Sequence, residues 1–306
     1  MLYDLIIIGS GAAGLSAGIY AGRYRMKALI IGKEFGGETA KAGAILNYPG
    51  FQSVDGYELM DLMKQQAAKL NVETLDAEVA SIKRQGHCFT VATGKKTYEA
   101  GVVIFAVGAE RRRLGLPNEK ELTGRGVHYC VTCDGPVYTG KTIAMVGGGD
   151  ASVKGVILAS EYAKKVFLIA RRKKITAEPI NLDYLQKLKD KTEIILETEV
   201  KEIIGKDKLE KIILSRPRKG SSELIIDGLF VEIGSVPSVS LAESLGVELD
   251  ERGYVKVDNM MRTNVDGVFA AGDVVNHFGS FKQDIAAAAM GAVAATSAYN
   301  DHKIHG

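Results

Sequence analysis

YDLIIIGSGAAG, residues 3–14, is the stretch of this 306-residue sequence that decides its fold. The β-branched apolar run at 3–8 predicts a strand buried on both faces. A Gly-x-Gly-x-x-Gly fingerprint follows at 9–14 and leads into a helical pattern that reaches about Tyr24. A second apolar run at 28–31 completes a strand–helix–strand unit, with the glycines at the turn from strand to helix. This arrangement predicts a nucleotide-binding unit.

The same order of elements recurs in the middle of the chain. The apolar run IAMV at 143–146 precedes GGGDAS at 147–152, a helical pattern to about Ala163 and a further apolar run, VFLIA, at 166–170. One glycine fingerprint is weak evidence, but two copies with the correct flanks indicate an internal duplication. We therefore predict an α/β fold with two Rossmann-like nucleotide-binding domains.

Shorter strands are expected beside each copy. Four strand-like segments separated by polar turns lie at 77–83, 87–93, 95–100 and 102–107. A matching set occupies about 193–233, and another strand-like piece lies at 267–273. A long Ala-rich helix is predicted from about Gln283 to Tyr299, with a disordered or merely exposed tail after Asn300.

Composition narrows the class of protein. Hydrophobic residues make up 46% and charged residues 25%, and the formal net charge is only +2. These values are typical of a globular chain and indicate neither nucleic-acid binding nor a membrane surface. No apolar stretch reaches the ~20 residues needed to span a bilayer. The apolar opening has no basic leader or small-residue cleavage site, so we expect no signal peptide and a cytoplasmic protein.

The first fingerprint is suited to binding a pyrophosphate through backbone N–H groups and a helix N-terminus. Gly9 permits the tight turn, Gly11 lets the backbone approach the phosphates, and Gly14 lets helix and strand pack closely. The acid that would bind a ribose about 20 residues later is absent, because Gly32 ends the second strand. Glu34 is near enough to replace it.

The second fingerprint is followed by a basic run. Arg171 and Arg172 stand at the end of the next strand, where an arginine pair suits a 2′-phosphate better than the bare ribose of NAD. Lys173 and Lys174 continue the run, so a solvated basic surface is the alternative interpretation.

Cys130 and Cys133 are spaced to form a disulfide across one turn. Such pairs have thiol pKa values of about 7 or below, which keeps a thiolate available for exchange. Asp134 follows directly and could relay a proton, and His128 could tune the thiols. Zinc is disfavoured because a site usually needs four Cys or His ligands and no second pair exists, so no metal is expected. Cys88 has the character of a small buried residue without a role.

These parts fit one electron path. A nicotinamide delivers two electrons as hydride, disulfide reduction consumes two, and a flavin can pass them between the two. Two nucleotide-binding folds can hold both cofactors. The N-terminus of the last helix, near Gln283, could stabilise negative charge on a reduced flavin.

The chain resembles the low-molecular-weight thioredoxin reductases, FAD-dependent pyridine nucleotide-disulfide oxidoreductases, over essentially its full length. The segments that carry the resemblance are IIIGSGAAGLSAGIYAGR, GGE followed by LNYPGF, VIFAVGA, HYCVTCDGP, VGGGDAS, and TNVDGVFAAGDV followed by Lys282-Gln283. A CxxC-Asp segment just ahead of a second glycine fingerprint is highly specific to this family among flavoproteins.

The resemblance implies a domain plan and a function. An FAD-binding domain at 1–113 and 242–306 would be interrupted by an NAD(P)H-binding and redox-disulfide domain at 114–241, in a homodimer. Hinges near Arg113–Pro117 and Pro237–Leu241 would let one domain rotate between two states. The enzyme would be a thioredoxin-disulfide reductase that passes electrons from NADPH through FAD to a thioredoxin- or glutaredoxin-like protein.

The resemblance also assigns residues. Cys133 should lie against the flavin, Cys130 should attack the partner's disulfide, and Asp134 should act as acid/base. Asp273 should bind the ribityl chain of FAD, and Lys282 and Gln283 should lie near the flavin ring. The expected FAD site comprises Gly9, Ser10, Gly11, Ala12, Ala13, Gly14, Glu34, Gly37, Glu38, Asn47, Val79, Ala106, Gly108, Asp273, Lys282 and Gln283. The expected NADPH site comprises Gly147, Gly149, Asp150, Ala151, Ser152, Arg171, Arg172 and Gly234.

The sequence departs from the family where the nicotinamide should bind. The usual His-Arg-Arg with a further Arg four residues beyond the pair reads Ala170-Arg171-Arg172 with Thr176. The usual paired glutamates read Lys154-Gly155, and the third small residue of the fingerprint is Ser152. The donor could therefore be NADH, ferredoxin or another carrier instead of NADPH. A flavin-binding redox sensor without efficient turnover is a third reading.

Overall fold

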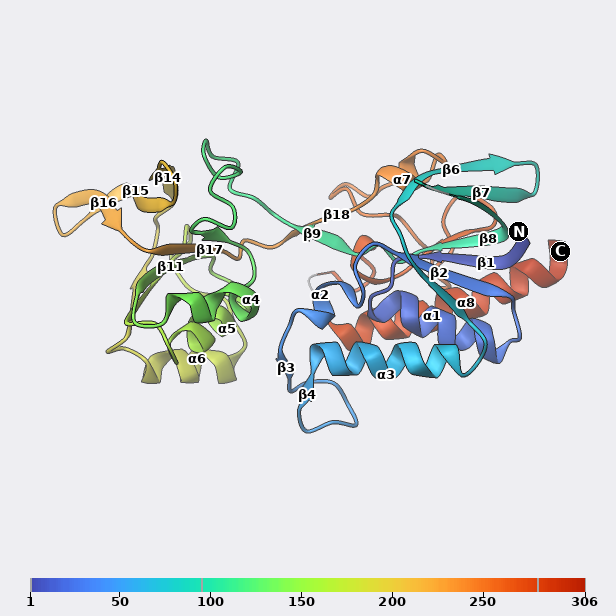
Figure 1. Cartoon of the computed structure of the whole chain (residues 1–306), viewed down its shortest axis with the longest axis horizontal. Helices are drawn as coiled ribbons and strands as arrows, with labels where there is room; N and C mark the ends of the chain where they lie inside the picture. Colours follow the sequence, from blue (N-terminus) through green and yellow to red (C-terminus); the bar gives the residue numbers. More distant parts are fainter. Residues whose placement is uncertain (1, 95, 280, 306) are drawn as a thin grey trace. The chain divides into compact units, whose positions relative to one another are not determined.

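The structure is a computed structural model and describes residues 2–94, 96–279 and 281–305 (Figure 1). The chain forms two compact units, one from Met1–Glu110 with Pro237–Gly306 and one from Arg111–Val236. The observed boundaries lie at 110/111 and 236/237, a few residues before the boundaries expected at 113/114 and 241/242. The reason is that β9 (Ala109–Arg111) pairs with β18 (Ser235–Pro237), so both crossings of the chain lie in this short two-stranded ribbon.

A seven-stranded sheet forms the centre of the first unit. Its order is β5-β2-β1-β8-β7-β6, with β19 also paired to β8. The pairs of β1 with β2 and β8, of β2 with β5 and of β19 with β8 are parallel, whereas β6, β7 and β8 pair in antiparallel fashion. The strands are β1 (Leu2–Ile8), β2 (Ala28–Gly32), β5 (Glu73–Asp76), β6 (Val79–Gln85), β7 (Cys88–Thr93), β8 (Thr97–Phe105) and β19 (Val268–Ala270).

The expectation of separate strands at 95–100 and 102–107 is wrong. Residues 97–105 form the single strand β8, because its first half pairs with β7 and its last residues pair with β19. Lys95 lies outside the described residues. This long strand joins the antiparallel edge of the sheet to its parallel centre, so that the fingerprint after β1 lies beside the end of β8.

Three helices lie on the same side of this sheet (Figure 1): α1 (Ala12–Arg23), α3 (Gly56–Ala68) and α8 (Asp284–His305). Helices α1 and α8 pack very closely, since a β-carbon on Gly291 would lie 2.1 Å from the carbonyl oxygen of Ala13. The expected tail after Asn300 is instead helical, and His302 Nε2 lies 3.4 Å from Asp4 Oδ1. The remaining elements are α2 (Gly37–Ala40), β3 (Ala44–Ile45), β4 (Val54–Asp55), α7 (Ser240–Glu243) and η2 (Gly272–Val274).

The second unit has a five-stranded parallel sheet, in the order β10-β17-β11-β12-β13, and a three-stranded antiparallel sheet, β14-β15-β16. Apolar clusters bury both faces of the parallel sheet, as continuous apolar strands require. Helix α5 ends at Ala159, four residues earlier than expected. The elements are β10 (Val127–His128), α4 (Val131–Asp134), η1 (Gly135–Tyr138), β11 (Thr142–Val146), α5 (Asp150–Ala159), β12 (Lys165–Ile169), α6 (Pro179–Lys187), β13 (Thr192–Ile195), β14 (Val200–Gly205), β15 (Leu209–Arg218), β16 (Ser221–Ile225) and β17 (Gly228–Val231).

Both units therefore have the predicted order of strand, glycine turn, helix and parallel strand, which confirms the predicted α/β class. None of the helices in the described part of the chain has the length and apolar character needed to cross a membrane.

Candidate nucleotide and redox sites

The first glycine turn is fixed by close backbone packing. Gly9 has φ 114°, and a β-carbon there would lie 2.1 Å from the carbonyl oxygen of Ala106. A β-carbon on Gly14 would lie 1.9 Å from the carbonyl oxygen of Gly9. These two glycines are therefore required by the protein's own packing, as the fingerprint predicts.

Gly11 is different, because the protein leaves it room. Its φ is −79°, and a β-carbon there would meet only the carbonyl oxygen of Gly36, at 3.8 Å. Gly11 is also the N-cap of α1, and no side chain caps this helix. The first-turn N–H groups of a helix lack intrahelical partners, so open backbone at this point fits a bound pyrophosphate. The residues present thus fit the dinucleotide expected here.

A structural reason for the missing ribose acid lies in Gly32. A β-carbon on Gly32 would lie 2.2 Å from Ser10 Oγ, so any side chain at the end of β2 would collide with the glycine turn. Ser10 Oγ donates to the carbonyl oxygen of Glu34 at 3.0 Å, and Gly36 N donates to the carbonyl oxygen of Ser10 at 3.1 Å. These bonds keep Glu34 beside the fingerprint, where a ribose-binding acid is needed.

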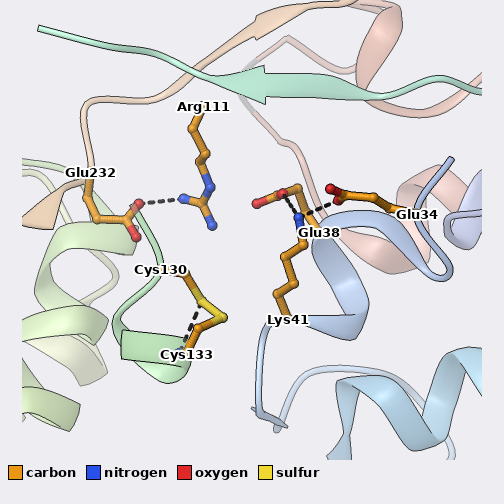
Figure 2. Close-up of polar contacts among 7 residues, drawn as sticks. All are labelled: Glu34, Glu38, Lys41, Arg111, Cys130, Cys133 and Glu232. Carbon is orange, nitrogen blue, oxygen red and sulfur yellow. Dashed lines mark hydrogen bonds and ion pairs between the residues drawn. A yellow bond between two sulfur atoms is a disulfide. The ribbon is translucent and has the colours of Figure 1, made fainter. Parts of the chain in front are cut away.

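Lys41, which the sequence did not single out, contacts two residues expected at the FAD site. Its Nζ lies 2.6 Å from Glu34 Oε2 and 3.2 Å from Glu38 Oε1, and Figure 2 shows the lysine reaching both carboxylates. Burial lowers the pKa of Lys41, but the bonds to the two glutamates outweigh it and leave the pKa raised. Only the spacing of three between Glu38 and Lys41 hinted at this contact.

Half-buried charged groups gather where η2 meets the start of α8. Burial raises the pKa of Asp273; the Lys282 cation opposes this, while Asp284 and Glu38 add to it. Burial likewise lowers the pKa of Lys282, which donates to the carbonyl oxygen of Val275 and lies 4.3 Å from the centre of the Tyr254 ring. This half-buried carboxyl and ammonium supply an acceptor and a donor for a polar ligand.

The other expected FAD residues lie around these groups. Asn47 Nδ2 donates to Gln283 Oε1 at 2.9 Å, which brings two residues 236 positions apart into contact. Ala106 N donates to the carbonyl oxygen of Ile8, so Ala106 lies at the end of β1. The remaining members sit at the start of α1, on the turns after β2 and β8, and at the start of β6: Ala12, Ala13, Gly37, Gly108 and Val79.

In the second unit, Cys130 and Cys133 form a disulfide, with their Cα atoms 5.3 Å apart (Figure 2). Cys130 is the N-cap of α4, and its Sγ accepts a hydrogen bond from Cys133 N at 3.1 Å. Cys133 is exposed and Cys130 is half-buried. Cys88 is a free thiol. The described residues contain no group of three or more His, Cys, Asp or Glu side chains that could hold a metal ion.

Asp134 contacts a buried histidine. His128 Nδ1 lies 3.1 Å from Asp134 Oδ2, and His128 Nε2 lies 2.7 Å from the Tyr138 hydroxyl oxygen. Burial, followed by the charges of Asp134 and Asp227, raises the pKa of Tyr138. Tyr138, which the sequence did not single out, is thus linked to Asp134 through His128.

The second glycine turn repeats the geometry of the first. Gly147 has φ 150°, and a β-carbon there would lie 2.2 Å from the carbonyl oxygen of Glu232. Gly149 caps α5 without a side-chain cap, and nothing lies within 4 Å of its β-carbon position. Ser152 replaces the third glycine and donates its hydroxyl to the carbonyl oxygen of Gly149 at 2.7 Å. This turn fits a second pyrophosphate.

The segment after β12 folds back onto this turn. Thr176 donates to the carbonyl oxygen of Gly148 through both its N (2.8 Å) and its Oγ1 (3.1 Å). Asp150 Oδ1 accepts from Glu178 N and Asn181 Nδ2, and these bonds outweigh burial to lower the pKa of Asp150. The glycine turn, the basic run and α6 are therefore held together.

Two more groups complete this end of the second unit. Arg171 and Arg172 are both exposed at the end of β12. Arg111 NH1 lies 2.5 Å from Glu232 Oε2, an ion pair beside Gly147 that sequence patterns did not reveal (Figure 2). Gly234, with φ 95°, follows Glu232, and Ala151 lies in the first turn of α5.

Comparison with known proteins gives one consistent result. The sequence profile described as pyridine nucleotide-disulphide oxidoreductase matches residues 3–295. The chain is 40% identical to the thioredoxin reductase of Mycolicibacterium smegmatis over 301 residues, which cover 97% of this chain and 96% of that protein. Its structure is similar to the crystal structure of Lactococcus lactis thioredoxin reductase, with a TM-score of 0.93, 33% identity and 99% of each chain covered.

A third similarity bears on the electron donor. A crystal structure called a ferredoxin-flavin thioredoxin reductase, from Clostridium acetobutylicum, is 33% identical and covers 99% of this chain and 98% of that one, with a TM-score of 0.53.

Proposed function

The chain belongs to the pyridine nucleotide-disulphide oxidoreductase family, and from this premise we propose that it reduces the disulfide of thioredoxin or of a glutaredoxin-like protein. The observation that carries the proposal is the Cys130–Cys133 disulfide, in a unit whose glycine turn leaves Gly149 open for a dinucleotide. The name of the M. smegmatis relative supports thioredoxin as the partner class. The same proposal includes a homodimer and a cytoplasmic location.

FAD is the cofactor proposed for the first unit. Gly11 and the uncapped start of α1 would hold its pyrophosphate, Glu34 would accept from the ribose hydroxyls, and Asp273 would accept from the ribityl chain. Lys282 and Gln283 border the ring. When bound, the flavin supplies a two-electron carrier between a donor and the disulfide.

The cysteines carry out the exchange with the partner. In the dithiol state, the Cys130 thiolate attacks a sulfur of the partner's disulfide and forms a mixed disulfide. The partner's second sulfur leaves and takes a proton. Cys133 then attacks Cys130 Sγ, which re-forms the Cys130–Cys133 disulfide and releases the partner's first sulfur. Cys133 N, which donates to Cys130 Sγ, favours the charged thiolate on Cys130. Asp134, the residue after Cys133, serves in this proposal as the group that accepts and returns the proton.

NADPH is the first-choice donor. Backbone N–H groups at Gly149 and the uncapped start of α5 would donate to its pyrophosphate, and the exposed Arg171 and Arg172 would bind its 2′-phosphate. A second donor class has a specific observation in its favour. Thr176 stands where the family pattern has an arginine and is bound to the Gly148 carbonyl, so one phosphate-binding cation is missing. The name of the C. acetobutylicum protein suggests ferredoxin as that alternative.

An anaerobic titration of the flavin absorbance tests the donor. NADPH should bleach the flavin at low concentration, and NADH should require much more. If dithionite bleaches the flavin and neither nucleotide does, NADPH as donor is wrong, and reduced ferredoxin is tested next. If no donor supports flux although the disulfide titrates, the protein is a redox sensor and the enzyme proposal fails.

Matched cysteine variants test the disulfide. Cys133→Ser should abolish reduction of thioredoxin while leaving FAD bound. Cys88→Ser, which changes the free thiol in β7, should keep normal flux. A Cys133→Ser protein that reduced thioredoxin at the normal rate would contradict the proposed function.

A further inference from the structure

His128 lies at the end of β10, two residues before Cys130, and is only 7% exposed. Both of its ring nitrogens have partners. Nδ1 lies 3.1 Å from Asp134 Oδ2, and Nε2 lies 2.7 Å from the hydroxyl oxygen of Tyr138. The imidazole therefore bridges the proposed acid/base and a buried phenol.

Packing fixes the orientation of this bridge. The His128 ring stacks on Phe230, with ring centres 5.2 Å apart and planes 26° apart. Tyr138 meets both His128 and Phe230 edge-on. Gly228 leaves space for Tyr138, since a β-carbon there would lie 2.7 Å from the tyrosine ring. The imidazole plane is therefore held in one position by its neighbours.

The groups that face the bridge determine where the hydrogens lie. An ionised Asp134 can only accept, so the hydrogen of a neutral His128 belongs on Nδ1. Nε2 then accepts from Tyr138, whose pKa is raised by burial, by Asp134 and by Asp227, so that its hydroxyl stays protonated. Lys141 Nζ, 5.3 Å from the centre of the Tyr138 ring, is the cation facing the far side of the phenol.

We propose that His128 is a positioning residue that holds the Asp134 carboxyl group in place as the acid/base of the disulfide exchange at Cys130 and Cys133. The inference rests on the proposed function, because Asp134 has its role only in that exchange. When the dithiol reduces a disulfide, one S–S bond breaks and another forms, and two protons pass from the cysteine thiols to the two leaving sulfurs. The contact with His128 Nδ1 fixes the position of the Asp134 carboxyl group, so that it can exchange a proton with a thiol of the pair.

The test uses the full-length flavoprotein and needs neither thioredoxin nor a nucleotide. The protein is reduced with dithiothreitol, desalted without oxygen, and mixed with 5,5′-dithiobis(2-nitrobenzoate) at pH 5 to 9. The variants are His128→Ala, His128→Asn and, as the control, His87→Ala, which changes an exposed histidine between β6 and β7.

His128→Ala should slow the reaction about 10-fold at neutral pH, less than the 10²–10⁴-fold expected for loss of an acid/base group itself. His128→Asn should restore most of the rate, since its amide N–H can stand in for Nδ1. His87→Ala should match the parent protein.

An unchanged rate in His128→Ala would overturn the proposal. So would a His128→Asn variant that fails like His128→Ala with an equal drop in melting temperature, because the role would then be structural only. If the parent dithiol reacts normally but no donor supports flux to thioredoxin, the proposed function fails and the His128 comparison still stands.

Discussion

The carbonyl oxygen of Ala106 lies 2.1 Å from the position that a β-carbon on Gly9 would occupy. The same relationship recurs in the second unit, where the carbonyl oxygen of Glu232 lies 2.2 Å from a β-carbon on Gly147. In each case the residue directly follows a parallel strand, β8 or β17, that is paired with the strand leading into the glycine turn. The first glycine of each fingerprint is thus required by the neighbouring strand, whatever the ligand.

The first prediction separates folding from binding in the FAD unit. Gly11→Ala adds a β-carbon in open space at φ −79°, so the free energy of unfolding of the apoprotein should change by no more than about 0.5 kcal/mol. The affinity for FAD should fall about 10-fold or more, because the methyl group occupies the phosphate approach. Gly9→Ala should instead yield little folded protein. Flavin fluorescence and urea unfolding measure the two effects, and normal FAD binding by Gly11→Ala would refute the assigned site.

The second prediction concerns the ribose acid. Glu34→Ala should weaken FAD binding about 10-fold, since a hydrogen bond to a charged acceptor contributes about 1.5–3 kcal/mol. Its backbone bond from Ser10 remains, so stability should hold. Glu78→Ala is the control: its side chain is 65% exposed and pairs only at the surface with Lys33. Equal affinities in both variants would show that Glu34 does not bind the ribose.

The sequence predicted the parallel cores of both units well, because glycine turns flanked by apolar runs are local signals. It split β8 because Gly101 and the polar residues before it resemble a turn, whereas pairing with β7 keeps the strand continuous. It missed the helical end of α8, which the His302–Asp4 contact stabilises across 298 positions of the chain.

The residues of the candidate site likewise fall into those that a local sequence pattern predicts and those that only the folded chain brings together. Cys130 and Cys133 could be identified from the sequence because only two residues lie between them. Lys41 and Tyr138 could not, since their roles depend on contacts made only in the folded chain. The ion pair of Glu232 could not be predicted either, because its partner Arg111 lies 121 residues earlier in the chain.

The third prediction is a loss of stability at alkaline pH. Burial, with a hydrogen bond to Glu119, raises the pKa of Tyr129 to about 12. Because the folded state holds this proton more tightly than the unfolded one, stability is fully present below about pH 10 and is lost as the pH rises towards 12. The slope from Tyr129 should stay below about 1.4 kcal/mol per pH unit, since the ring is partly exposed. Between pH 9 and 11.5, the free energy of unfolding measured in urea should fall less steeply in Tyr129→Phe than in the parent protein. Equal slopes in the two proteins would contradict the prediction.

The last prediction decides between donors. Gly149 has no atom within 4 Å of its β-carbon position and an ordinary φ of −101°, so Gly149→Ala should fold normally. If a nicotinamide dinucleotide is the donor, the added methyl group meets its pyrophosphate, and KM for NADPH should rise about 10-fold. Gly94→Ala, at an equally open glycine in the first unit, should leave KM for NADPH unchanged.

With dithionite as electron source, both variants should reduce thioredoxin like the parent, because the glycine turn is then bypassed. A protein carrier that delivers electrons directly to the flavin would likewise be insensitive to Gly149→Ala. Normal NADPH-driven flux in this variant would therefore mean that the second glycine turn does not bind the donor.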